Sequence, residues 1–303
     1  MTKFLRLILP ALLLALILVF SLAACRDTDD FVPPDDPELP AEAGTIFANP
    51  LLIPTGPGEQ PTVLAEFSAR ARDLHAINDH TIGWLYAPNT SIDDVVMWYY
   101  PASREDIWFY LRRDFYRRWS WEGTYFADFR TNWGGGTRGE ISRNIVIYGH
   151  SMEDDPNGAL FSQFKRWKDE QWARENPYIF FSTLQEDMVW EIFSVQITNR
   201  NVDYIYPNPD DEKFQLIIDD AKARSIFNYD IEVTIEDTIL TLSTCVYNIP
   251  TPDGFLPVAY PNDFRYVVVA RLVEPNAILS DTTSLTVNPS PVDPRQEGFA
   301  SAS

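Results

Sequence analysis

The residues of this 303-residue chain that are best suited to do chemistry stand at the ends of predicted strands. Cys245 ends the run ILTLSTC, His150 ends NIVIYGH, and Arg265 opens RYVVVARLV. A thiolate is a nucleophile, and an imidazole can hold or donate a proton for a leaving amine. A guanidinium can donate hydrogen bonds to an oxyanion and keeps its charge. Because side chains at strand ends converge on clefts, the three residues form a coherent set for acyl transfer.

Other candidate groups have simpler interpretations. His75 lies in a predicted helix and His80 in the turn after it, and we expect both at the surface. The acidic run 210–212 precedes another predicted helix and is expected to be solvated or to cap that helix. The aromatic residues between positions 98 and 133 are expected to serve packing and not a ligand. The sequence has no Ser nucleophile elbow, no Gly-rich phosphate loop and no spaced His/Cys cluster.

Short strands must position the three chemical residues. Apolar residues at helical spacing predict helices over 61–78, 159–176 and 214–227. Alternating and β-branched runs predict strands over 81–88, 144–150, 178–184, 188–197, 233–237, 239–245 and 265–273. Many short strands with few helices indicate a mostly β fold with helical insertions, either a barrel or a sandwich.

The motifs around these residues resemble those of sortases, the cysteine transpeptidases of the bacterial surface. NIVIYGH, TLSTC and the Arg-led strand resemble the family's histidine, cysteine and arginine motifs, and TLSTC is the most specific of them. INDHTIGWLYAPNT, FADFR and ALFSQFKRW are similar to class B members in particular, so the resemblance extends over 62–274. It implies a sortase-type closed β-barrel of about eight strands. An N-terminal helix and a helix between the sixth and seventh strands are expected within a catalytic domain over 61–275.

The resemblance also implies a mechanism. Cys245 would attack the Thr carbonyl of a C-terminal sorting signal on a secreted protein, a signal often of the N-P-x-T-x type in class B members. His150 would protonate the departing amine, and Arg265 would steady the oxyanion or the bound signal. An amine of a peptidoglycan precursor or of a pilin lysine would then resolve the thioester. No cofactor and no metal are implied.

Some neighbouring residues leave the substrate less defined. Thr241, Ser243 and Thr244 would contact a substrate only if their hydroxyls face it. The family often has Tyr-Pro-Val where this chain has the run 93–96, and Asn where Ser151 stands. Two alternatives to transfer remain open: a cysteine hydrolase that releases proteins, and a binding module that keeps the fold without catalysis.

The N-terminus is that of an exported protein. Residues 1–25 combine a basic start, an apolar run and the quartet Leu-Ala-Ala-Cys, which looks like a bacterial lipobox. Cys25 is then the lipidated first residue of the mature protein. The alternative is an uncleaved N-terminal transmembrane helix. Both interpretations put the domain at the extracytoplasmic face of the membrane, and an acylated Cys25 leaves Cys245 without a disulfide partner.

The remaining segments are low in core-forming residues. The Pro- and acid-rich stretch 26–60 is expected to be a tether, and 276–303 a disordered C-terminal tail. The formal net charge of −20 argues against nucleic acid as a partner.

Overall fold

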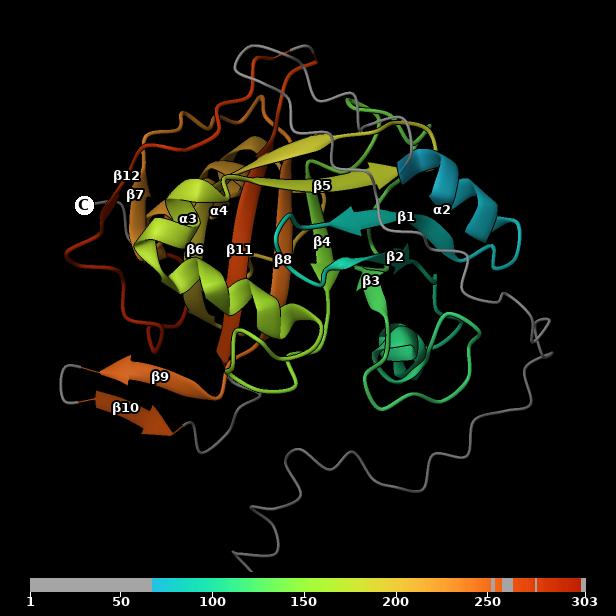
Figure 1. Cartoon of the computed structure of the whole chain (residues 1–303), viewed down its shortest axis with the longest axis horizontal. Helices are drawn as coiled ribbons and strands as arrows, with labels where there is room; N and C mark the ends of the chain where they lie inside the picture. Colours follow the sequence, from blue (N-terminus) through green and yellow to red (C-terminus); the bar gives the residue numbers. More distant parts are fainter. Residues whose placement is uncertain (1–66, 252–253, 258–263, 276, 301–303) are drawn as a thin grey trace, which may run out of the picture.

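Eight strands of the computed structural model close into a barrel in the order β1-β2-β3-β4-β8-β11-β6-β5 (Figure 1). The structure describes residues 67–251, 254–257, 264–275 and 277–300. The barrel strands are β1 (Thr81–Tyr86), β2 (Asp93–Met97), β3 (Tyr125–Ala127), β4 (Asn144–Tyr148), β5 (Tyr178–Thr183), β6 (Val189–Asn199), β8 (Ile239–Cys245) and β11 (Phe264–Leu272). The predicted mostly β fold with a closed barrel is confirmed.

Helices and two small sheets surround the barrel. The helices are α2 (Phe67–His75), the 3-10 helices η2 (Arg104–Arg112) and η3 (Phe161–Lys168), α3 (Glu170–Glu175) and α4 (Asp211–Arg224). The small sheets pair β9 (Asn248–Thr251) with β10 (Gly254–Pro257), and β7 (Phe227–Tyr229) with β12 (Leu285–Val287). Helix α4 lies between β6 and β8, the sixth and seventh barrel strands, as predicted.

The barrel interior is an apolar core to which all eight strands contribute. Alternate residues of a strand point to opposite faces, and on β8 Leu240 and Leu242 belong to this inner cluster. Phe161, Phe164 and Trp167 of η3 pack into the same cluster. These three side chains are at most 1% exposed. Helix η3, which precedes α3, is therefore fixed against the barrel by large buried side chains, and this rigidity matters for the loop that leads into it.

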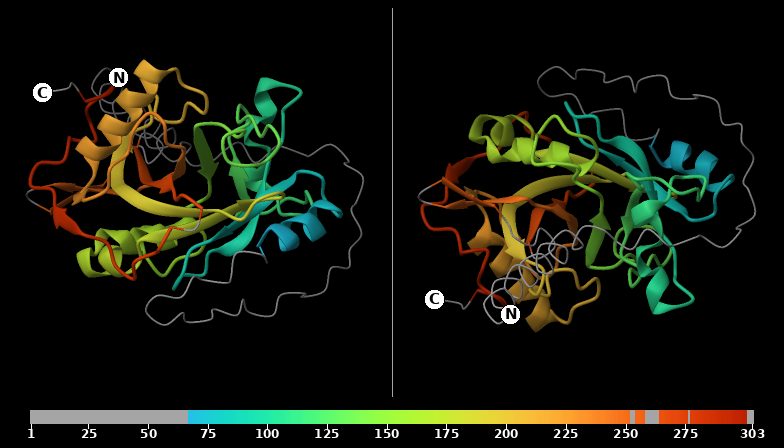
Figure 2. Two further views of the ribbon diagram at one scale, coloured as in Figure 1. Left: turned by 90° about the horizontal axis from the view of Figure 1, so that it is seen from above. Right: turned by 90° about the horizontal axis from the view of Figure 1, so that it is seen from below.

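The outer face of β8 and β11 is covered by α4. Ile239, Val267 and Val269 pack there with apolar side chains of α4, among them Phe214 and Ile218. Seen from above or from below, α4 lies on one side of the barrel and the η3–α3 segment lies on the other (Figure 2).

The acidic run 210–212, which was expected to be solvated or to cap a helix, caps α4. The side chain of Asp210 accepts a hydrogen bond from the backbone N–H of Lys213, and Asp211 and Glu212 lie in the first turn. Negative charge at a helix N-terminus is favourable.

The C-terminal segment differs from the expected disordered tail. Within 277–300, β12 pairs antiparallel with β7, and Leu285 is only 3% exposed. The tail also closes over Arg224, whose side chain is fully buried and is bonded to the carboxylate of Asp220. Arg224 donates to the carbonyls of Asp293, Gln296 and Gly298. The segment is held in place by its backbone carbonyls, which satisfy the buried charge of Arg224, and by Leu285, which packs into the apolar core.

Two local predictions were also wrong. The predicted strand 233–237 contains a turn, in which the Asp237 carboxylate accepts hydrogen bonds from the N–H and hydroxyl of Thr234. Such local bonds compete with strand pairing. The predicted helix 159–176 is divided into η3 and α3 at Asp169, whose side chain caps α3 through the N–H of Trp172.

The predictions for 1–25 and 26–60 lie outside the described residues. Within the part of the chain that the structure describes, none of the helices has the length and apolar character needed to span a membrane.

Candidate functional site

Strand pairing puts Cys245 directly opposite Arg265. Strands β8 and β11 are antiparallel, and in their register Cys245 is the partner of Arg265. Directly opposed residues of an antiparallel pair have Cβ atoms about 5 Å apart and share one face. This face also carries Ile239 and Val267, so it is the outer face of the barrel. Cys245 is a half-buried free thiol, and Arg265 is half-buried.

The histidine reaches the same place through a parallel pair. Strand β4 runs parallel to β8, with Tyr148 opposite Ser243. The pairing continues beyond the strand: Gly149 N–H donates to the Ser243 carbonyl at 3.4 Å, and Thr244 Oγ1 donates to the Gly149 carbonyl at 2.6 Å. Extending this register by two residues brings His150 alongside Cys245. The structure therefore gathers the three predicted residues from three adjacent strands.

The imidazole of His150 is oriented by a backbone carbonyl of η2. Its Nε2 lies 2.9 Å from the Leu111 carbonyl oxygen. Because a carbonyl oxygen only accepts hydrogen bonds, Nε2 carries the proton in the neutral ring. Nδ1 is then the nitrogen at which a proton can be gained or lost.

Gly123 makes room for this carbonyl. It has φ +66°, and a Cβ at this position would lie 2.4 Å from the Leu111 oxygen and 2.6 Å from the Tyr110 oxygen. Only glycine combines the left-handed backbone with this close approach. The Gly123 position is therefore part of the support of His150, which sequence reasoning did not identify.

Tyr204 is a buried neighbour that the sequence did not indicate. Its hydroxyl pairs with Ser243 Oγ at 2.8 Å. Burial raises its pKa and the charge of Cys245 acts in the same direction, whereas Arg265 and the Ser243 bond oppose the shift. The phenol is therefore close enough to sense both Cys245 and Arg265. It comes from the loop between β6 and α4, which has no periodic pattern.

The hydroxyls predicted as possible substrate contacts have internal partners. Thr241 Oγ1 donates to Asn144 Oδ1 at 2.7 Å, Ser243 pairs with Tyr204, and Thr244 donates to the Gly149 carbonyl. All three residues are at most 3% exposed. Thr241 and Thr244 tie β8 to β4 and to the residue that follows it, Ser243 ties β8 to the loop between β6 and α4, and all three hydroxyls are thus engaged within the fold.

The other two histidines lie elsewhere. His75 Nδ1 is 2.8 Å from the Thr81 carbonyl, and His80 Nδ1 is 2.9 Å from the Tyr110 hydroxyl. Both are half-buried, more enclosed than the predicted surface position. The described residues hold no group of three or more His, Cys, Asp or Glu side chains arranged for a metal ion.

A barrel with a thiol opposite a guanidinium and an imidazole alongside is the arrangement that the resemblance to sortases implies, and the sequence comparisons agree with that resemblance. Residues 131–273 match the family model of the sortase domain. The resemblance to class B is confirmed: the chain is 27% identical over 203 residues to sortase B of Listeria monocytogenes, covering 66% of this chain and 77% of that one. It is 28% identical over 202 residues to sortase B of Staphylococcus aureus, covering 66% and 73%.

Solved structures of class B sortases are similar as well. The Staphylococcus aureus sortase B–substrate complex has a TM-score of 0.56 at 25% identity, covering 69% of this chain and 86% of that one. Clostridium perfringens sortase B has a TM-score of 0.54 at 28% identity, covering 67% and 99%. The comparisons thus agree that the chain resembles class B sortases, a family of cysteine transpeptidases.

Proposed function

We propose that Cys245, His150 and Arg265 together cleave a C-terminal sorting signal of secreted proteins and transfer the acyl group to an amine. The observation that carries this proposal is the register of β4, β8 and β11, in which the thiol has the guanidinium opposite and the imidazole alongside. A transpeptidase needs a nucleophile, a proton carrier and an oxyanion partner, and these three side chains supply them.

In the first half-reaction, the Cys245 thiolate attacks the carbonyl carbon of a Thr in the signal. The carbonyl oxygen takes the negative charge, and the Arg265 guanidinium donates hydrogen bonds to it. The C–N bond then breaks, and the departing amine takes a proton from Nδ1 of the His150 imidazolium, because Nε2 is held by Leu111. The products are a Cys245 thioester and the released end of the signal.

In the second half-reaction, an amine attacks the thioester carbon. Neutral His150 accepts the proton of the amine at Nδ1, the C–S bond breaks, and the thiolate is restored. A peptidoglycan precursor or a pilin lysine would supply this amine. A solved sortase B that is 26% identical to this chain was crystallised with triglycine, a peptide with a free amine, which supports an amine acceptor. The N-P-x-T-x signal is proposed because the chain resembles class B members.

A peptide library tests the substrate and the reaction together. The full-length protein is incubated with fluorogenic candidate signals, with and without triglycine as the acceptor, and the products are identified by mass spectrometry. We expect cleavage after Thr, a thioester on Cys245 and ligation to triglycine. Cys25→Ser is expected to keep this activity and Cys245→Ala to lose it, and wild-type turnover by Cys245→Ala would refute the proposal. Hydrolysis alone in the presence of triglycine would identify a hydrolase.

We also propose that Cys25 carries a lipid that holds the domain at the extracytoplasmic face of the cytoplasmic membrane. The support is the quartet Leu-Ala-Ala-Cys after an apolar run. Mass spectrometry of protein extracted from membranes should find a chain that begins at lipidated Cys25. An intact segment 1–25 would instead favour the single transmembrane helix.

A further inference from the structure

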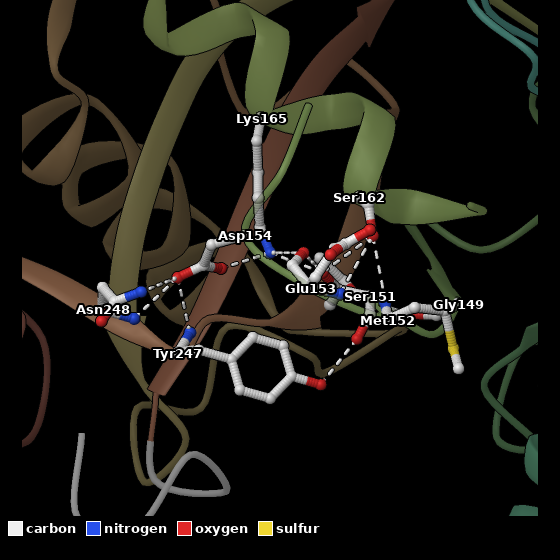
Figure 3. A network of polar contacts seen from close by, with 10 residues as sticks. Gly149, Ser151, Met152, Glu153, Asp154, Ser162, Lys165, Tyr247 and Asn248 are labelled. Atoms are coloured by element: carbon white, nitrogen blue, oxygen red, sulfur yellow. Dashed lines mark hydrogen bonds and ion pairs between the residues drawn. The ribbon is translucent and has the colours of Figure 1, made fainter. Parts of the chain in front are cut away.

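A lysine is buried beside the loop that follows His150. Lys165 belongs to η3, and its side chain is 1% exposed. Its Nζ lies 2.5 Å from Ser151 Oγ, 2.8 Å from the Glu153 carbonyl and 2.5 Å from Asp154 Oδ1 (Figure 3). A buried ammonium is costly unless it is fully paired, and this one has a partner for each of its three N–H groups. All three partners lie in the loop 151–154.

The carboxylate of Asp154 continues the network to the other strand. Its Oδ2 accepts hydrogen bonds from the N–H of Tyr247 at 3.0 Å, the N–H of Asn248 at 2.7 Å and the Asn248 side chain at 3.2 Å. The Tyr247 hydroxyl returns to the Ser151 carbonyl at 2.7 Å. Figure 3 shows the Asp154 carboxylate between Lys165 on one side and Tyr247 and Asn248 on the other. The network therefore joins the loop after His150 to the segment after Cys245.

We propose that Lys165 and Asp154 are positioning residues of the acyl-transfer site, and that their ion pair fixes His150 and Cys245 relative to each other. The inference rests on the proposed function for the roles of those two residues. Lys165 is well placed for this purpose because η3 is fixed to the barrel core by Phe161 and Phe164. The loop after His150 and the segment after Cys245 are thus both held to η3 through Lys165 and Asp154.

The network also decides which amides are available near the thiol. The N–H groups of Tyr247 and Asn248 point at Asp154, so they are occupied and do not serve an oxyanion. Stabilisation of the oxyanion therefore falls to other donors, of which Arg265 opposite Cys245 is the one with a full charge.

Charge links the pair to the thiol as well. Burial lowers the pKa of Lys165, whereas the carboxylate of Asp154 and the thiolate of Cys245 act to raise it, and Lys168 acts to lower it. The ammonium of Lys165 and the thiolate of Cys245 therefore attract each other. A positively charged neighbour promotes the reactivity of a cysteine.

If Lys165 and Asp154 only stabilise the fold, their variants should behave differently than if they position the site. The rate at which iodoacetamide alkylates Cys245 separates these two roles. Loosening the fold exposes the thiol and speeds alkylation, whichever partner is removed. Under the positioning role, Lys165→Met leaves a negative charge near the thiol and should slow alkylation about fivefold or more. Asp154→Asn leaves the positive charge and should not slow it. Lys165→Arg keeps the charge and should react within about threefold of wild type.

The experiment uses the full-length protein at neutral pH, and mass spectrometry of the Cys245 peptide keeps Cys25 out of the measurement. A matched control is Arg224→Met, which breaks the buried pair of Arg224 with Asp220 on α4. It should lower the melting temperature as Lys165→Met does while leaving both alkylation and peptide turnover near wild type. Asp154→Asn is close in shape to the native residue and keeps the test open if Lys165→Met does not fold.

The expected result is slower alkylation in Lys165→Met but not in Asp154→Asn, with peptide turnover reduced about tenfold or more in both. Faster alkylation in both variants, or equal turnover losses in Lys165→Met and Arg224→Met, would overturn the inference. If wild type cleaves no signal peptide, the proposed function fails. The alkylation rates still decide whether Lys165 and Asp154 act on the thiol.

Discussion

Replacing Gly123 by Ala tests whether the Leu111 carbonyl controls the proposed proton carrier. The added Cβ would lie 2.4 Å from that oxygen, and ordinary contact needs about 3.4 Å, so the two must separate by about 1 Å. The strand end cannot swing away freely: Thr124 donates its N–H to the Tyr110 carbonyl at 3.1 Å and its hydroxyl to the Arg113 carbonyl at 2.8 Å. The displacement is therefore expected to pass into η2.

The effect on His150 follows from the size of this shift. The present distance from Nε2 to the Leu111 oxygen is 2.9 Å, and an increase of about 1 Å exceeds the range of a hydrogen bond. A misplacement of this size at a catalytic group costs on the order of 100-fold in turnover. The left-handed backbone costs about 1–2 kcal/mol and the lost hydrogen bond about 1 kcal/mol of unfolding free energy.

Gly139→Ala is the matched control. Gly139 has φ +80°, so alanine is strained there too, but its Cβ would have no atom within 4 Å. This variant should lose about 1–2 kcal/mol and keep wild-type turnover. The assays are urea unfolding and cleavage of a signal peptide. If Gly123→Ala loses stability yet keeps its turnover, as Gly139→Ala should, the Leu111 carbonyl does not orient the imidazole and the reasoning is refuted.

Three further predictions concern the network around β8 and the C-terminus. Thr244→Val removes the hydrogen bond to the Gly149 carbonyl at nearly constant side-chain volume and should lower the free energy of unfolding in urea by about 1–3 kcal/mol. An unchanged midpoint of urea unfolding would show that this hydroxyl does not stabilise the fold. Removing the residues after 275 should lower the melting temperature, because burial of Leu285 alone is worth about 2 kcal/mol and Arg224 loses its carbonyl partners. An unchanged melting curve would show that this segment is dispensable for stability. Burial raises the pKa of Asp154, but its contacts with Lys165 and Tyr247 outweigh this and hold the pKa below its usual value. The stability that depends on this ionised carboxylate is present at neutral pH and is lost as the pH falls below about 4, so unfolding free energies of Asp154→Asn should decline less in acid than those of wild type.

Much of the fold and the three proposed chemical residues could be predicted from the sequence. The strand that leads to His150 and the strand that ends at Cys245 are short continuous runs of apolar or β-branched residues, and such runs indicate buried strands. The pairing of Cys245 with Arg265 is between sequential barrel strands, which are commonly neighbours.

The supports of the site were not predictable, for a physical reason. Leu111 acts through its backbone carbonyl and Tyr204 from an irregular loop, so neither leaves a pattern of residue types. Lys165 sits in an amphipathic segment where a lysine normally faces water, and only the folded loop 151–154 makes its burial possible. The C-terminal segment was misjudged because its order depends on the buried charge of Arg224.

The parallel pairing of β4 with β8 has a consequence for how activity first arises. Parallel neighbours need a long crossover, and here η3, α3, β5, β6, α4 and β7 are all made between the two strands. The β8–β11 pair can bring Cys245 to Arg265 without help from β4, whereas His150 arrives only when that whole crossover has closed. In a newly made chain Cys245 and Arg265 are therefore expected to come together first, and the proposed acyl-transfer site is complete only when the crossover between β4 and β8 has closed.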